Sequence, residues 1–235
     1  MVEVIMDSPL VNELTYLFYP RVCVICGEEL LEEEEGGCLK CLFQLPRTRN
    51  YLVEDNTVEK LMAARLPFVR MASYCIYSQG GMLPPLIHHM KYRGKKEIGI
   101  LLGRLFGCDL LGSDFLKPVD LIVPVPLHVD KEKARGYNQA EMIALGLSEA
   151  TSLPVSTGNL IRVISNPTQT RRTKTQRWEN VKGIFDIVDS TLFEGRHLLL
   201  VDDVITTGST IEACGVALQK CKGAKISVAT LGQVL

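Results

Sequence analysis

One strand, turn and helix unit near the C-terminus constrains the fold of this chain more than any other feature. Residues 197–204 read His-Leu-Leu-Leu-Val-Asp-Asp-Val, an apolar strand that ends in the adjacent carboxylates Asp202 and Asp203. A turn rich in hydroxyl groups follows, and residues 210–222 have the apolar spacing of a helix. Because ligands of open α/β sheets bind beyond the carboxyl ends of strands, this unit predicts an α/β fold with a polar site at the end of this strand.

The turn after the carboxylates has the composition of a phosphate-binding loop. Thr206, Thr207, Ser209 and Thr210 supply hydroxyl donors around Gly208. The following helix supplies free backbone N–H groups and the positive end of its dipole, so the loop suits a phosphate monoester. The carboxylates repel phosphate, but they can hold a sugar diol and a metal-bound water. A simpler alternative for the two carboxylates alone is that they cap the turn.

The chain from residue 67 onward alternates strand and helix patterns. Apolar runs predict strands at residues 69–77, 119–125, 160–164, 184–188, 197–204 and 224–233. Helical spacing predicts helices at residues 86–91, 98–111, 138–150 and 210–222. Strands separated by helices of this length predict a mainly parallel sheet with helices on both faces. One face of the last helix carries Ile211, Cys214, Leu218 and Cys221, which we expect in the core.

Four of the eight cysteines lie in one short segment near the N-terminus. Cys23 and Cys26 are separated by two residues, and so are Cys38 and Cys41. Two such pairs bring four thiolates to one metal, for which tetrahedral Zn²⁺ is the expected ion, with an iron–sulfur centre or a redox pair as alternatives. Because no ligand position is left for a catalytic water, we expect a structural zinc that holds together a segment too small to form a core.

These patterns divide the chain into three parts. Residues 1–45 contain a short helical segment at 10–19 and the cysteine module, residues 46–66 form a polar connector, and residues 67–235 form the α/β domain. The N-terminal residues lack the basic start and apolar stretch of a secretory signal. No run reaches the roughly 18 apolar residues of a membrane span. We therefore expect a cytoplasmic protein with no membrane span, where clustered cysteines serve as metal ligands.

The net charge of −1 excludes little, but the basic residues are unevenly distributed. Residues 162–182 contain Glu179 as their single acid and the cations Arg162, Arg171, Arg172, Lys174, Arg177 and Lys182. This stretch can bind pyrophosphate, or it can bind single-stranded nucleic acid with Trp178 as a stacking platform. The sequence leaves both alternatives open.

Other motifs extend the pattern beyond the strand, turn and helix unit. They are Lys91-Tyr92-Arg93-Gly94, Asp120-Leu-Ile-Val-Pro124-Val-Pro126-Leu-His128, Arg135-Gly136-Tyr137-Asn138-Gln139, and Arg177 with Asn180, Val181 and Phe185. With residues 201–210 and the cysteine pairs, they make the chain resemble the ComF family of competence-associated, type I phosphoribosyltransferase-like proteins from about residue 20 onward. The resemblance implies a type I phosphoribosyltransferase-like sheet with an N-terminal zinc ribbon. Residues 137–139 also begin a helix, where capping by Asn138 and packing of Tyr137 are an alternative role.

The resemblance also implies a ligand, phosphoribosyl pyrophosphate (PRPP), bound with Mg²⁺. In that site Asp202 and Asp203 would hold the ribose hydroxyls together with the metal. The 5-phosphate would bind the loop formed by Thr206, Thr207, Gly208, Ser209 and Thr210. The cations available to neutralise the pyrophosphate are Lys91, Arg93 and Arg135. Pro124 and Pro126 would stiffen the turn that exposes backbone to the pyrophosphate, and the bond before Pro126 can be cis.

Two functions are consistent with the resemblance. The first is an enzyme that transfers the ribosyl 5-phosphate group of PRPP to a nitrogen nucleophile and releases pyrophosphate, whose charge Mg²⁺ and cations neutralise. The second is a non-catalytic protein of DNA uptake, natural competence or recombination, which binds single-stranded DNA, a competence helicase or a recombination mediator. The sequence identifies neither the acceptor nor a general base.

Overall fold

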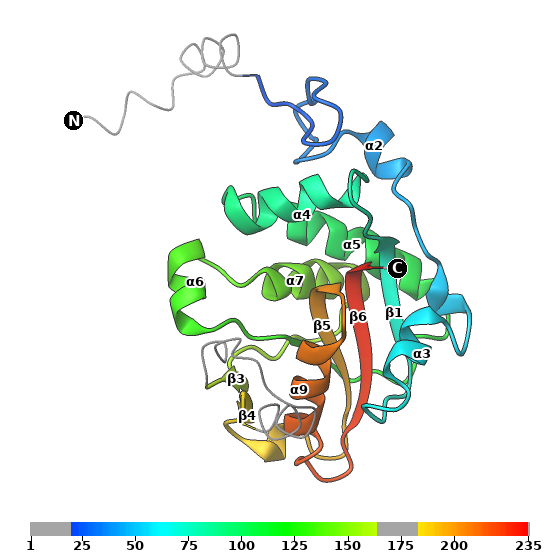
Figure 1. Cartoon of the computed structure of the whole chain (residues 1–235), viewed down its shortest axis with the longest axis vertical. Coiled ribbons are helices and arrows are strands. Elements are labelled where there is room, and N and C mark those ends of the chain that lie inside the picture. The colour runs from blue at the N-terminus through cyan, green and yellow to red at the C-terminus, as the bar shows by residue number, and fades with distance from the viewer. Residues whose placement is uncertain (1–19, 164–182, 235) are drawn as a thin grey trace, which may run out of the picture.

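A four-stranded parallel sheet forms the centre of the computed structural model, which describes residues 20–163 and 183–234 (Figure 1). The strand order is β1-β6-β5-β2. The strands are β1 (Met71–Ile76), β2 (Leu121–Pro124), β5 (His197–Ile205) and β6 (Lys225–Gln233). The pairs β1–β6, β6–β5 and β5–β2 are parallel, which confirms the predicted sheet.

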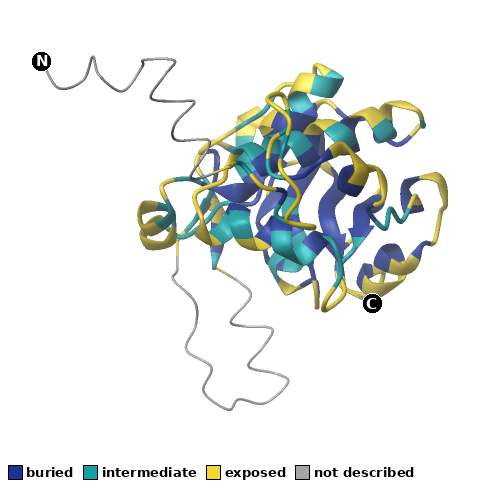
Figure 2. Cartoon of the chain, turned by 90° about the horizontal axis from the view of Figure 1, so that it is seen from above, coloured by how far each residue is buried: buried dark blue, intermediate teal, exposed yellow. Residues whose placement is uncertain are grey.

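Helices cover both faces of this sheet. The helices on one face are α4 (Leu83–Tyr92), α5 (Glu97–Leu111) and α7 (Gln139–Thr151), and those on the other are α3 (Thr57–Met62) and α9 (Ser209–Leu218). Side chains alternate along β5, so Leu199 packs toward α5 and α7 and Leu200 packs toward α3 and α9. Since both faces are covered, β5 reads as a continuous apolar run, and Figure 2 shows the buried residues gathered at the centre.

The helices α5 and α7 approach each other through glycines. A Cβ atom at Gly103 would lie 2.2 Å from the carbonyl oxygen of Ile143, and one at Gly146 would lie 2.0 Å from the carbonyl oxygen of Ile100. Only glycine permits this approach, because any side chain would overlap the facing backbone. The close packing fixes α7, whose first turn borders the predicted site.

Two short helices lie where the sequence predicted connecting segments. The first, α3, begins at Asn56, whose side chain accepts hydrogen bonds from the N–H groups of Val58 and Glu59 while the Glu59 carboxylate accepts from the N–H of Asn56. The second, α6 (Val129–Arg135), begins at His128, whose Nδ1 accepts from the N–H of Asp130 at 3.3 Å. Side-chain caps define both helices, so a search for apolar periodicity misses them.

The cysteine module is continuous with the main core. It contains α2 (Leu39–Phe43), and Leu42 of this helix packs into the apolar cluster beneath α4 and α5. A Cβ atom at Gly36 would lie 2.5 Å from Ile98 of α5, and one at Gly37 would lie 3.7 Å from Leu86 of α4. The module therefore rests on the two helices that flank the C-terminal edge of the sheet.

The remaining elements are short. The 3-10 turns are Asn50–Leu52 and Ser190–Leu192, and β3 (Leu160–Arg162) pairs antiparallel with β4 (Phe185–Ile187) near the predicted positions.

The predicted helix at residues 10–19 lies outside the described residues, as does the basic stretch with Arg171, Arg172, Lys174, Arg177, Lys182 and Trp178. Among the helices within the described ranges, none combines the length and the apolar character that crossing a membrane requires.

Candidate PRPP-binding site

The carboxylates Asp202 and Asp203 lie at the C-terminal end of β5, where the sequence placed the site. Asp203 is buried and Asp202 is half-buried, and the N–H of Asp203 donates to Oδ1 of Asp202 at 2.8 Å. Burial, and then the negative charge of Asp203, raise the pKa of Asp202 to about 7. Burial and mutual repulsion make it unfavourable for both carboxylates to be ionised. A pair held together despite this repulsion is typical of a site that binds a cation or several hydrogen-bond donors.

Lys91 reaches this pair from the last turn of α4. Its Nζ atom lies 2.7 Å from Oδ2 of Asp203. The sequence predicts that Lys91 contacts pyrophosphate, whereas in the structure Lys91 pairs with a carboxylate. The ammonium group therefore lies at the boundary between the acidic pair and the surface toward α6.

The loop after β5 is open to a ligand. Gly208 has a φ of +77° and begins α9 without a side chain that can cap it, so the first N–H groups of the helix stay available. Thr206, Thr207 and Ser209 are exposed and Thr210 is half-buried. The Thr207 hydroxyl donates to the Ser209 hydroxyl at 3.2 Å. These donors surround one helix N-terminus, which is the arrangement expected of a phosphate loop.

Two residues that the sequence did not predict support this loop: Met62 at the end of α3, and Arg65 just after that helix. A Cβ atom at Gly208 would lie 2.2 Å from Sδ of Met62, so the loop contacts a fully buried side chain. The guanidinium of Arg65 donates to the carbonyl oxygen of Thr207. The capping pair Asn56 and Glu59 is the sequence signal that locates this helix.

The loop after β2 is fixed by the first residues of α7. The Asn138 amide donates to the carbonyl oxygen of Val125 at 3.0 Å, and its Oδ1 accepts from the N–H of Ala140 at 3.0 Å. The Tyr137 hydroxyl donates to the carbonyl oxygen of Met90 in α4. Capping by Asn138 and packing of Tyr137 are thus confirmed. All peptide bonds in the described residues are trans, including the one before Pro126.

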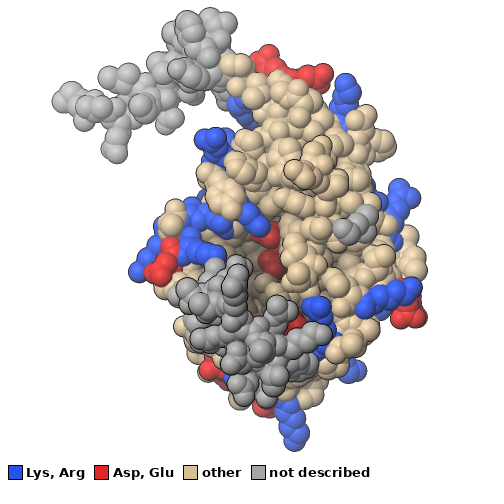
Figure 3. Space-filling view, in the orientation of Figure 1, with Lys and Arg blue, Asp and Glu red and all other residues tan. Residues whose placement is uncertain are grey.

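The predicted cations are distributed unevenly. Arg135 and Lys91 line one open cavity of about 530 Å³ between α4 and α6, next to Asp203. Arg93 is exposed at the end of α4 and is not part of the cavity wall. Figure 3 shows basic side chains on this face beside a recess that contains acidic ones.

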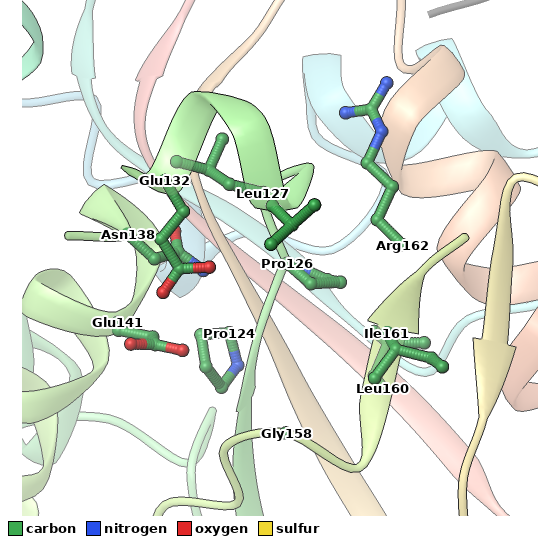
Figure 4. Close-up of a pocket in the computed structure, with 11 residues that line it drawn as sticks. Pro124, Pro126, Leu127, Glu132, Asn138, Glu141, Gly158, Leu160, Ile161 and Arg162 are labelled. Atoms are coloured by element: carbon green, nitrogen blue, oxygen red, sulfur yellow. The ribbon is translucent and has the colours of Figure 1, made fainter. Parts of the chain in front are cut away.

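A second hollow, of about 270 Å³, lies on the other side of the loop after β2. Glu132 of α6 and Glu141 of α7 point into it, with Arg162 of β3 across the space (Figure 4). Burial, and then the charge of Glu132, raise the pKa of Glu141. The sequence did not predict this pair, because α6 has too little apolar periodicity to be recognised.

The four cysteines of the N-terminal module form a cluster. The sulfur atoms of Cys23, Cys26, Cys38 and Cys41 all lie within 4.8 Å of one another. Sulfurs around a tetrahedral zinc with bonds of about 2.3 Å are about 3.8 Å apart, and Cys26 and Cys38 show a separation of 3.8 Å. Burial raises the pKa of Cys23, but the N–H groups of Cys26, Cys38 and Ile25 outweigh it and lower the pKa to about 7. The donor set fits Zn²⁺.

Comparison with known proteins places the chain in a family. Residues 110–233 match the phosphoribosyl transferase domain family. Competence protein ComFC of Bacillus subtilis (strain 168) is 33% identical over 249 residues, covering 94% of this chain and 98% of that protein. The chain belongs to the ComF family. Among other ComF relatives, DNA utilization protein YhgH of Escherichia coli (strain K12) is 28% identical and covers 91% of both chains. Competence protein F of Haemophilus influenzae is 30% identical, covering 88% of this chain and 82% of that protein.

The ComF chain has the type I phosphoribosyltransferase fold with an N-terminal four-cysteine cluster. A solved adenine phosphoribosyltransferase aligns with it at 15% identity and a TM-score of 0.38, covering 76% of this chain and 90% of that one. The glutamine PRPP amidotransferase of Bacillus subtilis aligns at 21% identity and a TM-score of 0.40, covering 56% and 25%. The family match over residues 110–233, the 33% identical relative, the parallel sheet and the cysteine cluster confirm the predicted fold class and family.

Proposed function

We propose that this ComF protein binds PRPP with Mg²⁺ and transfers its ribosyl 5-phosphate group to a nitrogen nucleophile, releasing pyrophosphate. The observation that carries the proposal is the acidic pair Asp202 and Asp203 at the end of β5, followed directly by an exposed hydroxyl loop at the N-terminus of α9. This arrangement offers acceptors for a ribose diol and donors for a phosphate within one continuous segment.

Each group of the site has a physical task in this reaction. The carboxylates of Asp202 and Asp203 accept hydrogen bonds from the ribose hydroxyls, while the loop of residues 206–210 holds the 5-phosphate. Lys91 and Arg135, which share one cavity wall, neutralise the pyrophosphate as the bond from C1 to its oxygen breaks. The nitrogen of the acceptor forms the new bond to C1 and loses its proton to solvent. When bound, Mg²⁺ would supply further positive charge to the pyrophosphate through ligand oxygens and waters.

We also propose that Cys23, Cys26, Cys38 and Cys41 hold a structural Zn²⁺. We further propose that the chain consists of a zinc module at residues 1–45, a connector at 46–66 and the phosphoribosyltransferase-like domain at 67–235. None of the eight cysteines forms a disulfide. This state suits a reducing compartment, so we propose a cytoplasmic location.

A non-catalytic role in natural competence is the second candidate. Two relatives are named competence proteins and one a DNA utilization protein. An exposed aromatic ring, Tyr92, lies among Lys91, Lys131 and Arg135. Stacking on such a ring combined with phosphate contacts suits single-stranded DNA, and the same protein would then bind a competence helicase or a recombination mediator.

The deciding experiment is calorimetric titration of PRPP with Mg²⁺ into the full chain and into the Asp202→Asn/Asp203→Asn variant. Micromolar binding that the variant loses supports the transferase, and a search for pyrophosphate release with candidate amines follows. Absence of PRPP binding to the unchanged protein rejects it. Single-strand binding that decreases steeply with salt and survives in the variant favours the second candidate.

A further inference from the structure

The open cavity between α4 and α6 has the lining of an anion site. Its wall consists of Lys91, Tyr92, Gly94, Lys131, Ala134 and Arg135. Three of these six residues are cations and none is acidic. The cavity lies beside the acidic pair of β5, because Lys91 both lines the wall and contacts Asp203. A negatively charged ligand therefore fits this space, whereas a cationic one does not.

Arg135 lines this wall and also carries a hydrogen-bond donor without a partner in the described part of the chain. Its Nη1 atom is buried and has no hydrogen-bond partner among the described residues. A buried guanidinium donor without an acceptor is costly, and native structures rarely leave one in that state. A phosphate oxygen is the acceptor that matches the planar, charged donor group of arginine.

Tyr92 gives the cavity an aromatic surface. Its side chain is 68% exposed, although a tyrosine of this size is usually more buried. The guanidinium carbon of Arg135 lies 5.6 Å from the centre of the Tyr92 ring, and the His88 ring lies 5.1 Å away. Flat cationic and aromatic groups of this kind stack on nucleobases. Pyrophosphate alone would use the cations but would leave Tyr92 without a role.

We propose that this cavity binds a mononucleotide, with the phosphate against Lys131 and Arg135 and the base against Tyr92. The site lies outside the proposed diol and phosphate cradle but shares Lys91 and Arg135 with the proposed pyrophosphate contacts, so a mononucleotide and the pyrophosphate of PRPP would compete for it. Nucleotide binding can be tested without PRPP. Because Lys91 belongs to the cavity wall and to the ion pair with Asp203, occupancy of the cavity and ligand binding at the acidic pair are thermodynamically linked.

The test is calorimetric titration of the full chain with AMP, GMP, CMP and UMP, each without PRPP, and separately with inorganic pyrophosphate. At least one nucleotide is expected to bind. Arg135→Gln is expected to weaken that binding roughly ten- to hundredfold through loss of a charge-assisted hydrogen bond, and Tyr92→Leu about fivefold or more through loss of stacking. Lys133→Gln removes a cation from the exposed side of α6 outside the wall, and it is expected to change nothing.

Other outcomes overturn the proposal. Binding of pyrophosphate without binding of any nucleotide means that the cavity receives the leaving group alone. Binding of an oligothymidylate without any mononucleotide means that it is a strand site. Nucleotide binding that Asp202→Asn/Asp203→Asn abolishes while Arg135→Gln retains it places the nucleotide in the cradle instead. Thermal melting of each variant distinguishes lost contacts from lost folding, and loss of PRPP binding alone in the double aspartate variant leaves this inference standing.

Discussion

The Nζ atom of Lys91 lies 2.7 Å from Oδ2 of Asp203, so the last turn of α4 is joined to the C-terminal end of β5. The two side chains are 25% and 13% exposed. Asp203 also adjoins Asp202, and the ammonium group offsets part of the repulsion between the two carboxylates. This contact connects the acidic pair with the basic cavity and, through α4, with the cysteine module.

Replacing Lys91 by glutamine leaves the Asp203 carboxylate buried without its counter-ion. We expect Lys91→Gln to lower the free energy of unfolding by about 1–2 kcal/mol, between the effects seen for exposed and buried ion pairs. Urea denaturation at neutral pH measures it, with the exposed Lys133→Gln as the matched control. In the double variant Lys91→Gln/Asp203→Asn the loss should be smaller than the sum of the single losses. Strictly additive losses would show that the pair contributes nothing.

Asp202→Asn should stabilise the protein at alkaline pH. The folded state raises the pKa of Asp202 to about 7, so it holds the proton more tightly than the unfolded state. The ionised carboxyl therefore opposes folding, and the stability of the unchanged protein decreases from about pH 4, the ordinary pKa, to about pH 7.

The Asp202→Asn variant has no ionisable group at this position, so it lacks this decrease in stability. We expect it to be more stable than the unchanged protein at pH 8 by about 1–2 kcal/mol, because solvent screens part of the charge of the half-buried Asp202. The difference should vanish near pH 4, and PRPP affinity should decrease. Urea denaturation across this pH range measures the effect, with the exposed Asp114→Asn as control. A variant that is less stable at pH 8 contradicts the pKa assignment.

Gly208→Ala should disturb the phosphate loop in two ways, by straining the backbone and by a steric overlap with a neighbouring side chain. The φ of +77° disfavours alanine, and the new Cβ would overlap Sδ of the buried Met62. We expect a loss of about 2–4 kcal/mol in the free energy of unfolding, with weaker PRPP binding. Gly80→Ala is the matched control, because Gly80 has a φ of +75° and open space around its Cβ position. Equal losses in both variants would show that the Met62 contact has no effect.

Removal of the metal should affect the PRPP site at a distance. Cys38→Ser is expected to abolish stoichiometric zinc, measured by metal analysis, and to lower the melting temperature. Because the module rests on α4 and α5, PRPP affinity should decrease roughly fivefold through a displaced Lys91. Cys108→Ser, at an exposed cysteine outside the cluster, is the control. Unchanged PRPP affinity in a zinc-free protein that stays folded contradicts this coupling.

The sequence by itself determined the features that depend on neighbouring residues. The apolar run of β5 with its terminal carboxylates predicted a strand buried on both faces and a site at its end, and Asp202 and Asp203 lie there. The spacing of Cys23, Cys26, Cys38 and Cys41 predicted a cluster, which the sulfur positions confirm. The motifs between residues 91 and 210 identified the family. Strand period, cysteine spacing and loop composition are local properties, so the sequence alone shows them.

Only the tertiary structure decided which groups meet across the fold. Lys91 pairs with Asp203, Met62 contacts Gly208, and Arg135 covers Tyr92 in a cavity between two helices. These contacts depend on how α3, α4 and α6 pack against the sheet, and α3 and α6 lack an apolar period long enough to be recognised. Their positions are determined by capping groups and by close packing of distant segments, whose free energy is realised only when the whole core is assembled.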